Sequence, residues 1–516
     1  MSEASFPYLS LLTGLPLVGA LVVAFLPKGN VGLARVVTLL WTLVVLGLAV
    51  GAWVAFTPNG ARFQLLESYP WIPAWDARFT FAVDGIALVM IALIAVFVPL
   101  VVLYSWHEVA GEAGTPARRS VNAYFALLLA LESTMIGVFA AADIFLFYVF
   151  FEVMLVPMYF LIGSYGGVRR QYAAVKFFLY SLVGGLFMLA AVIGLWVLGG
   201  HTFDWDALRS AEFSVTAERW LFLGFFLAFA IKAPFFPFHT WLPDAGGAAP
   251  AGAAALLVGV LDKVGTFGIL RYCLPLFPNA TKYFAPLGLA LALIGIVYAA
   301  LLAVGQNDLK RLVAYTSVAH FGFIGIGIFA LTTPAGSGAV LYMVNHGLAT
   351  GLLFLVVGML VSRRGSANVG DFGGAGRTLP VLAGVLLIAG LASLALPGTA
   401  PFVSEFLVLA GTYPANKAVA VVATIGIILA AGYVLWMIQR TTHGTPNPEL
   451  AGIRAMRKDL SWRESIVVGP LVALLIIFGF YPKPLLDVIT PAVTATLQDD
   501  VGVTDPVPAA VQEASQ

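Results

Sequence analysis

Apolar stretches of about 20 residues, the length of a membrane-spanning helix, recur along almost the whole chain and set its class of fold. The 516 residues are 60% hydrophobic and only 10% charged, whereas a soluble domain carries about 25% charged residues. The sequence therefore predicts an all-α polytopic membrane protein in a lipid bilayer. About 14 transmembrane helices are expected, over residues 8–26, 31–56, 81–106, 121–141, 143–164, 172–198, 219–241, 250–276, 283–304, 310–331, 337–361, 379–411, 415–440 and 464–481.

Loop charges predict the topology. One set of alternating loops holds about twice as many lysines and arginines as the opposite set, which places the richer loops in the cytoplasm and both termini outside. The first apolar run is followed by Pro27 and Lys28 without a small-residue cleavage site, so it is expected to be a spanning helix and not a signal peptide. The Trp- and Pro-rich residues 64–78 are expected to form an interfacial connection, and the acidic tail after Asp499 is expected to be disordered.

One predicted span is interrupted by residues that a lipid-facing helix avoids. Residues 220–250 (WLFLGFFLAFAIKAPFFPFHTWLPDAGGAAP) place Lys232 before Pro234, Pro237 and Pro243. A lysine at mid-membrane costs roughly 3 kcal/mol on insertion scales, and a proline inside a helix costs about 3 kcal/mol or more. Such breaks are tolerated where the backbone is buried in protein or lines a wet cavity. We expect a discontinuous helix that carries a buried cation, as in the ion sites of transporters.

The break recurs later in the chain. Ala233-Pro234-Phe235 reappears as Ala400-Pro401-Phe402 in an overlong helix that also carries a charge, Glu405. An odd number of predicted spans separates the two helices, so the repeats would be inverted in the membrane. The expected organisation is 1–120 with helices 1–3, 121–276 and 277–440 as two inverted five-helix repeats (helices 4–8 and 9–13), and 441–516 with helix 14 and a polar tail.

Ionisable residues fall inside several predicted spans. An isolated charge at this depth is costly, so these groups should pair, hydrate or neutralise. A series of such groups across the midplane could pass protons, and histidine suits intermediate steps because its ordinary pKa is about 6.5. Helix packing through polar contacts is the alternative for each of them. The candidates for a proton relay are Glu132, Glu152, Lys232, Lys263, His320, His346 and Glu405.

Other polar residues have simpler interpretations. His239 is expected to cap or anchor its helix, and Lys176 to extend toward a membrane face. The remaining carboxylates lie at helix starts, where a negative charge is favourable; they are Asp84, Asp143 and Asp308. The single cysteine, Cys273, excludes an internal disulfide and a self-contained cysteine-ligated iron–sulfur cluster.

Several motifs resemble those of the antiporter-like membrane subunits of respiratory complex I, the proton-translocating NADH–quinone oxidoreductase. Within that family the chain is most similar to the M-type, ND4-like members, because Glu405 stands where L- and N-type members are expected to carry lysine. Multisubunit sodium/proton antiporters and some membrane hydrogenases share the motifs. They are KAPFFPFHTWLPDA (232–245), LDKVGTFGILR (261–271), DLKRLVAYTSVAHFG (308–322), NHG (345–347), KFFLY (176–180) and DG (84–85).

The resemblance implies a proton-pumping subunit driven by quinone reduction elsewhere in the complex. Glu152 and Lys232 would form a charged pair, Lys263 a central relay and Glu405 the terminal group, with His320 and His346 between them. NAD, FMN, iron–sulfur clusters and quinone would be held by other subunits. The partners would be other membrane subunits, including L-like and N-like ones, in a bacterial inner membrane, and not nucleic acid; the net charge of +1 agrees. Gly246-Gly247-Ala248-Ala249 departs from the histidine and acidic residue that the family often has there.

Two other functions fit the same residues. In a multisubunit cation/proton antiporter, Glu152 and Lys232 would serve ion exchange, and sodium-dependent flux without NADH or quinone would reveal it. A structural spacer of the membrane arm would require the charges only for assembly. The density of charge inside the membrane argues against the spacer.

Overall fold

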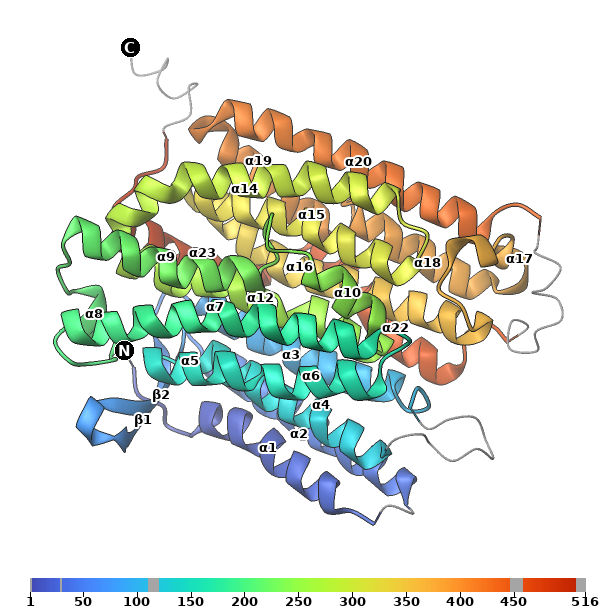
Figure 1. Cartoon of the computed structure of the whole chain (residues 1–516), viewed down its shortest axis with the longest axis horizontal. Helices are drawn as coiled ribbons and strands as arrows, with labels where there is room; N and C mark the ends of the chain where they lie inside the picture. The colour runs from blue at the N-terminus through green and yellow to red at the C-terminus, as the bar shows by residue number, and fades with distance from the viewer. Residues whose placement is uncertain (1, 28–29, 110–119, 446–457, 507–516) are drawn as a thin grey trace.

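The fold is given by a computed structural model, which describes residues 2–27, 30–109, 120–445 and 458–506. The long helices run roughly along the long axis of the molecule (Figure 1). In the described residues, 12 helical segments are long and apolar enough to cross a membrane. The predicted spans 219–241 and 379–411 are each interrupted. The class of all-α polytopic membrane protein is confirmed, whereas the count of 14 and the inverted repeats stay predictions.

The N-terminal part contains a β-hairpin that the sequence analysis did not predict. Residues 64–78, expected as an interfacial connection, form most of this antiparallel pair, with Glu67 opposite Phe81 and Tyr69 opposite Phe79. The third helix therefore begins at Gly85 and not near 81, because β2 continues to Val83. The elements are α1 (Tyr8–Phe25), α2 (Val31–Ala55), β1 (Gln64–Ile72), η1 (Pro73–Trp75), β2 (Ala77–Val83) and α3 (Gly85–Tyr104).

The hairpin also caps the first helix. The Glu67 carboxylate accepts hydrogen bonds from the backbone N–H groups of Leu9 (2.8 Å) and Ser10 (3.0 Å). Since the first N–H groups of a helix have no partner within the helix, this side chain satisfies two of them. A residue 58 positions away thus fixes the start of α1.

The middle part of the chain supplies the first interrupted helix. The predicted span 219–241 divides at Lys232 into α9 and α10, and the predicted span 250–276 alternates between α-helical and π-helical turns. The elements are α4 (Val121–Ala140), α5 (Ile144–Val153), α6 (Leu155–Tyr165), α7 (Arg170–Leu198), α8 (Trp205–Arg209), α9 (Val215–Lys232), α10 (Trp241–Ala248), α11 (Ala251–Leu256), η2 (Leu257–Leu261), α12 (Lys263–Gly268), η3 (Ile269–Cys273) and α13 (Leu274–Leu276).

The second interrupted helix follows the same plan with a different boundary. Ala400-Pro401-Phe402 opens the second segment of this helix, whereas Ala233-Pro234-Phe235 directly follows the first segment of the earlier one. The elements are α14 (Pro278–Val304), α15 (Leu309–Phe329), α16 (Thr333–Arg364), η4 (Val369–Asp371), α17 (Ala375–Thr378), α18 (Pro380–Ser393), α19 (Ala400–Ala415) and α20 (Lys417–Thr442).

The end of the described chain is ordered by ion pairs, and the expectation of disorder after Asp499 is wrong for the residues up to 506. The Asp500 carboxylate lies 2.6 Å from both Arg62 and Arg209, and its side chain is fully buried. Residues 507–516 of the expected tail lie outside the described residues. The closing elements are α22 (Trp462–Phe480), α23 (Lys483–Thr494) and η6 (Ala495–Val501).

The two described ends of the chain meet at one end of the bundle. Ser2 bonds to Phe63, next to Arg62, which binds Asp500. With an even number of membrane crossings, the two ends of a chain lie on the same side of the membrane.

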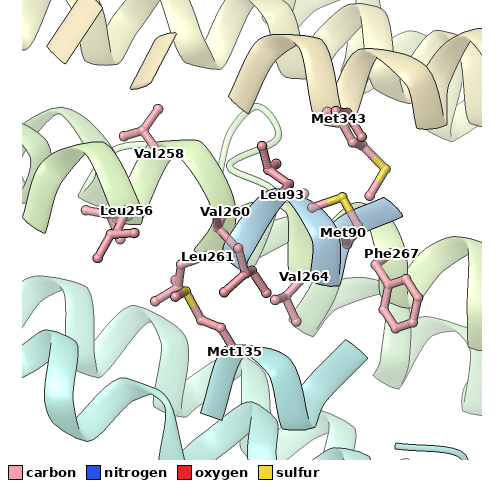
Figure 2. Packing of buried hydrophobic residues seen from close by; sticks show 14 of the residues in the cluster. Met90, Leu93, Met135, Leu256, Val258, Val260, Leu261, Val264, Phe267 and Met343 are labelled. Atoms are coloured by element: carbon pink, nitrogen blue, oxygen red, sulfur yellow. The ribbon is translucent and has the colours of Figure 1, made fainter. Parts of the chain in front are cut away.

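Three helical segments form the centre of the bundle. The apolar window of Ala251–Leu276 is 100% buried, and those of α15 and α16 are 94% buried, against 22% for α22. Figure 2 shows the packing around η2 and α12, where Leu261 and Val264 lie among Met90, Met135 and Met343. These central segments carry Lys263, His320 and His346 of the candidate site.

Candidate functional site

Protein groups bond to backbone carbonyls at the break in the first interrupted helix. α9 ends at Lys232, and the Trp241 indole donates a 2.8 Å hydrogen bond to the carbonyl of Ile231. The N–H of Phe235 bonds to the carbonyl of Ala230 at 2.9 Å. Pro234 leaves the Ala230 carbonyl without its helical N–H donor, so the Phe235 N–H bonds to it instead. The Ile231 carbonyl, which the Phe235 N–H would otherwise bond, is satisfied by the Trp241 indole. The break is therefore a defined structure that fixes the position of Lys232.

Lys232 is completely buried, and its ammonium finds no hydrogen-bond acceptor among the described residues. It lies over the rings of Phe151 (5.2 Å to the centroid) and Phe177 (5.5 Å). Cation–π contacts compensate only part of the lost hydration of a lysine. The ammonium is therefore left without a full set of partners.

Glu152 occupies space that a glycine leaves open. A Cβ atom at Gly185 of α7 would lie 1.6 Å from the Glu152 Oε1 atom, so any side chain there would displace the carboxylate. Oε1 is buried without a hydrogen-bond donor in the described chain. Glu152 and Lys232 form no ion pair within 4.0 Å. The charged pair expected from the resemblance is thus separated in this structure.

Lys263 begins α12 directly after the π-helical turn η2. In this wider turn the N–H of Asp262 donates to the carbonyl of Leu257, five residues back. The Lys263 ammonium donates to the carbonyl of Val258. The same ammonium lies 3.0 Å from the Asp262 carboxylate and 5.2 Å from the ring centroid of Phe321. Irregular π turns of this kind frequently occur at functional sites.

Polar side chains beyond Lys263 line up on α15, α16 and α19. His320 Nδ1 lies 2.6 Å from the Tyr342 hydroxyl, which lies 3.0 Å from Glu405 Oε2. The rings of His320 and His346 are 5.5 Å apart. We call Lys263, His346, His320, Tyr342 and Glu405 the polar file.

Unpartnered atoms mark where the polar file is incomplete. Both ring nitrogens of His346 and the Nε2 atom of His320 are buried without a hydrogen-bond partner in the described part of the chain. The Phe321 ring is near both groups, with its centroid 5.2 Å from the Lys263 ammonium and 5.5 Å from the imidazole centroid of His346. Buried polar atoms without a protein partner are the usual positions of internal water.

The second break is tied to the polar file through Asn345. Its side-chain amide donates to the carbonyl of Ala400 at 2.8 Å and lies 3.4 Å from the Ser404 hydroxyl. These contacts join the first turn of α19 to α16. Glu405 is thereby held beside Tyr342 of α16.

Glu132 is not brought into this arrangement. It lies within α4, fully buried, and neither carboxylate oxygen has a hydrogen-bond partner among the described residues. Its role in a relay stays a prediction. His239 packs its ring near Phe236 (6.0 Å) and Tyr298 (5.4 Å), away from the polar file.

Lys176 has an anionic partner that the sequence analysis did not predict. Its ammonium binds Asp244 at 2.7 Å, and Arg311 binds the other oxygen of the same carboxylate at 2.6 Å. The carboxylates Asp84, Asp143 and Asp308 do cap helices, accepting bonds from Ala87, Leu146 and Arg311. Asp84 also pairs with the buried Arg271 at 3.0 Å.

Sequence reasoning missed a hydrogen-bonded carboxylate in the loop after α3. Glu108 borders a cavity of about 400 Å³ together with Lys310 and His107. It accepts hydrogen bonds from Ala251 (2.5 Å) and Gly252 at the start of α11. Burial raises the pKa of Glu108, although the positive charge of Lys310 opposes the shift. Its position directly after an apolar helix was the available signal.

Asp143 shows a similar environment in the turn before α5. Burial raises its pKa to about 6, against the effect of the hydrogen bonds donated by Leu146 and Arg78. The capping role of Asp143 explains its position without any part in proton transfer.

The interrupted helices and the buried ionisable groups define a class: polytopic membrane proteins that carry ionisable residues along a central line of broken helices. Residues 141–430 match the family described as NADH:quinone oxidoreductase/Mrp antiporter, TM. The chain belongs to this family, and the resemblance inferred from the motifs is confirmed.

Known proteins are similar to this chain over almost its whole length. NADH-quinone oxidoreductase subunit M of Mycobacterium tuberculosis is 45% identical, with 97% of this chain and 96% of that protein covered. A structure described as respiratory complex I from Thermus thermophilus with bound NADH contains a chain that is 32% identical, with a TM-score of 0.85 over 96% of this chain and 100% of that one.

A chain of an Mrp complex shares this fold. A chain in the Mrp complex from Dietzia sp. DQ12-45-1b is 22% identical and has a TM-score of 0.80, over 97% of this chain and 53% of that one. At this identity the likeness concerns the fold alone.

Proposed function

We propose that the chain is a proton-translocating membrane-arm subunit of an NADH–quinone oxidoreductase of the complex I type. The observation that carries the proposal is the polar file, a hydrogen-bonded and closely packed set of ionisable groups in the most buried part of the bundle. The 45% identity to subunit M of M. tuberculosis supports the type of complex.

The proposed pathway has two parts. Glu152 and Lys232 form the first, and Lys263, His346, His320, Tyr342 and Glu405 form the second. Closing the gap between Glu152 and Lys232 would stabilise the charged lysine, and opening it would favour release of the proton. Quinone reduction elsewhere would drive this change, so that two linked states differ in their affinity for a proton.

Water completes the second part of the pathway. No hydrogen bond joins Lys263 to His346, and the unpartnered imidazole nitrogens offer positions for bridging water molecules. When the Tyr342 hydroxyl donates to Glu405, its oxygen can accept from His320 Nδ1–H. A proton could thus pass from imidazole to carboxylate through one hydroxyl.

The assembly follows from this assignment. The partners are other membrane subunits, including L-like and N-like ones, and NAD, FMN, iron–sulfur clusters and quinone are held elsewhere in the complex. No redox reaction is assigned to this chain. Its location is a bacterial inner membrane, with both termini outside.

Substitution of Lys232 tests the function. Lys232→Ala should leave the complex assembled and lower the number of protons pumped per electron in sealed vesicles by the contribution of this subunit. The matched control is Lys483→Ala, which removes an exposed lysine that pairs with Asp487 at the surface. An unchanged proton-to-electron ratio in Lys232→Ala would contradict the relay.

Cation/proton exchange is the second candidate, because the matched family includes Mrp antiporters. The same vesicles separate the two functions. Proton flux that requires sodium but neither NADH nor quinone would favour exchange, whereas flux that requires electron transfer supports the complex I type.

A further inference from the structure

A carboxylate that the pathway above does not use lies next to Lys263. Asp262 is completely buried, and its carboxylate approaches the Lys263 ammonium at 3.0 Å. Apart from this ion pair, neither oxygen has a hydrogen-bond partner among the described residues. The carboxylate therefore has capacity for a second donor.

The helix face of Asp262 points to the end of α9. Gly265, three residues later, packs against that end so closely that a Cβ atom would lie 2.5 Å from the Ala233 nitrogen and 2.5 Å from the Phe229 oxygen. Residues three apart share a face of a helix, and side chains lean toward its N-terminus. The Asp262 carboxylate therefore lies on the helix face that packs against the end of α9, where Lys232 is the last helical residue.

Apolar side chains pack on the turns next to Asp262. Figure 2 shows Val260, Leu261 and Val264 packed against Met90 and Leu93 of α3 and Met135 of α4. An ionised carboxylate in apolar surroundings is stabilised by a nearby cation. Lys263, in contact with Asp262, and Lys232, at the facing end of α9, are cations with which Asp262 can exchange a proton.

We propose that Asp262 carries protons between Lys232 and Lys263, which makes it a catalytic residue of the relay. This inference rests on the proposed proton-translocating function.

The transfer consists of two balanced steps. First, a Lys232 N–H bond breaks and an O–H bond forms on Asp262, so that an ammonium and a carboxylate become a neutral amine and a carboxylic acid. Second, the Asp262 O–H bond breaks and an N–H bond forms on neutral Lys263, which restores the carboxylate and leaves Lys263 as the ammonium. The final state has the Asp262–Lys263 ion pair that the structure contains.

A fixed counterion for Lys263 is the competing role, and one measurement separates the two. A carrier passes through a protonated carboxylic acid during turnover, whereas a counterion stays ionised. Infrared difference spectra of the assembled complex, recorded on reduction by NADH, should contain a carboxylic-acid band that shifts in Asp262→Glu and disappears in Asp262→Asn.

Pumping in sealed vesicles is measured on the same variants, with Lys232→Ala and Lys263→Ala as references. We expect Asp262→Asn to lose as much pumping per electron as Lys263→Ala does, and Asp262→Glu to retain most of it, because only the glutamate can take up a proton. NADH oxidation by an artificial acceptor verifies that the redox centres are present.

Two results would overturn the carrier role. Normal pumping in Asp262→Asn, with defective Lys232→Ala and Lys263→Ala, removes Asp262 from the relay and leaves the proposed function intact. The absence of an acid band that responds to Asp262→Glu also overturns it, and this measurement remains decisive if Asp262→Asn fails to assemble. Normal pumping in both lysine variants would instead remove the proposed function itself.

Discussion

The Tyr342 hydroxyl donates a 3.0 Å hydrogen bond to Glu405 and joins this carboxylate to the imidazole of His320. Tyr342 lies on α16 one turn before His346, so that one helix face supplies two members of the polar file. A tyrosine in an apolar helix usually serves packing. The hydrogen bonds to His320 and Glu405 distinguish Tyr342 from such a residue.

Removal of this hydroxyl should interrupt the file without unfolding the chain. In Tyr342→Phe we expect a loss of about 1 kcal/mol of stability from the hydrogen bond and a fall in protons pumped per electron similar to that of Glu405→Gln. Pumping in sealed vesicles and thermal unfolding of the purified complex measure the two effects. The control is Tyr272→Phe, whose buried hydroxyl bonds to the carbonyl of Ala141 and should affect stability alone. Equal pumping in both variants would contradict the prediction.

Substitution of Gly185 should reduce pumping as much as substitution of Glu152, whose carboxylate lies against this glycine. In Gly185→Ala the added methyl group overlaps the Glu152 carboxylate, which must leave its position against α7. We expect an assembled complex with pumping reduced to the level of Glu152→Gln. Gly384→Ala is the control, because a Cβ atom there meets no atom within 4 Å. Retained pumping in Gly185→Ala would show that the position of Glu152 is not critical.

The raised pKa of Glu108 predicts that the difference in pumping rate between the wild type and Glu108→Gln depends on pH. Burial raises its pKa, so the carboxyl is neutral at low pH and gains a negative charge as the pH rises through that pKa. Glu108→Gln is neutral at every pH. Pumping rates of the wild type and Glu108→Gln should therefore converge at acidic pH and diverge at alkaline pH, where the wild type alone attracts Lys310. The exposed Glu212→Gln should follow the wild type throughout, and a constant ratio for Glu108→Gln would contradict the assignment.

The sequence predicted the charged residues of the site because charge inside a membrane is costly and therefore informative. Lys232, Lys263 and Glu405 were identified in this way, and the structure places each of them beside a break or a π-helical turn. The same argument gives no distances, so it could not reveal that Glu152 and Lys232 are separated. Tyr342 was missed because an uncharged polar group in an apolar helix has no comparable cost.

The β-hairpin and the C-terminal segment were missed for a different reason. Residues 64–78 contain Trp, which is common at interfaces, and Pro, which is depleted in strands, so the pairing of Gln64–Ile72 with Ala77–Val83 was not predicted. An acidic tail is typically disordered by its composition. Asp500 is ordered only because Arg62 and Arg209, distant in sequence, converge on it.

This convergence leads to a prediction about stability. Asp500 joins the loop before β1, the helix α8 and the C-terminal segment through two arginines, and its own side chain is fully buried. In Asp500→Asn both guanidinium groups lose their carboxylate. The arginines are partly exposed and can rehydrate, so the cost should be about 1–3 kcal/mol, below the 3–5 kcal/mol of a completely buried pair. We expect faster proteolysis of the segment after α22 and a lower unfolding temperature, with protons pumped per electron unchanged. Asp487→Asn, which breaks an exposed pair with Lys483, should have almost no effect. Equal proteolysis of the two variants would show that the Asp500 ion pairs do not hold the C-terminal segment in place.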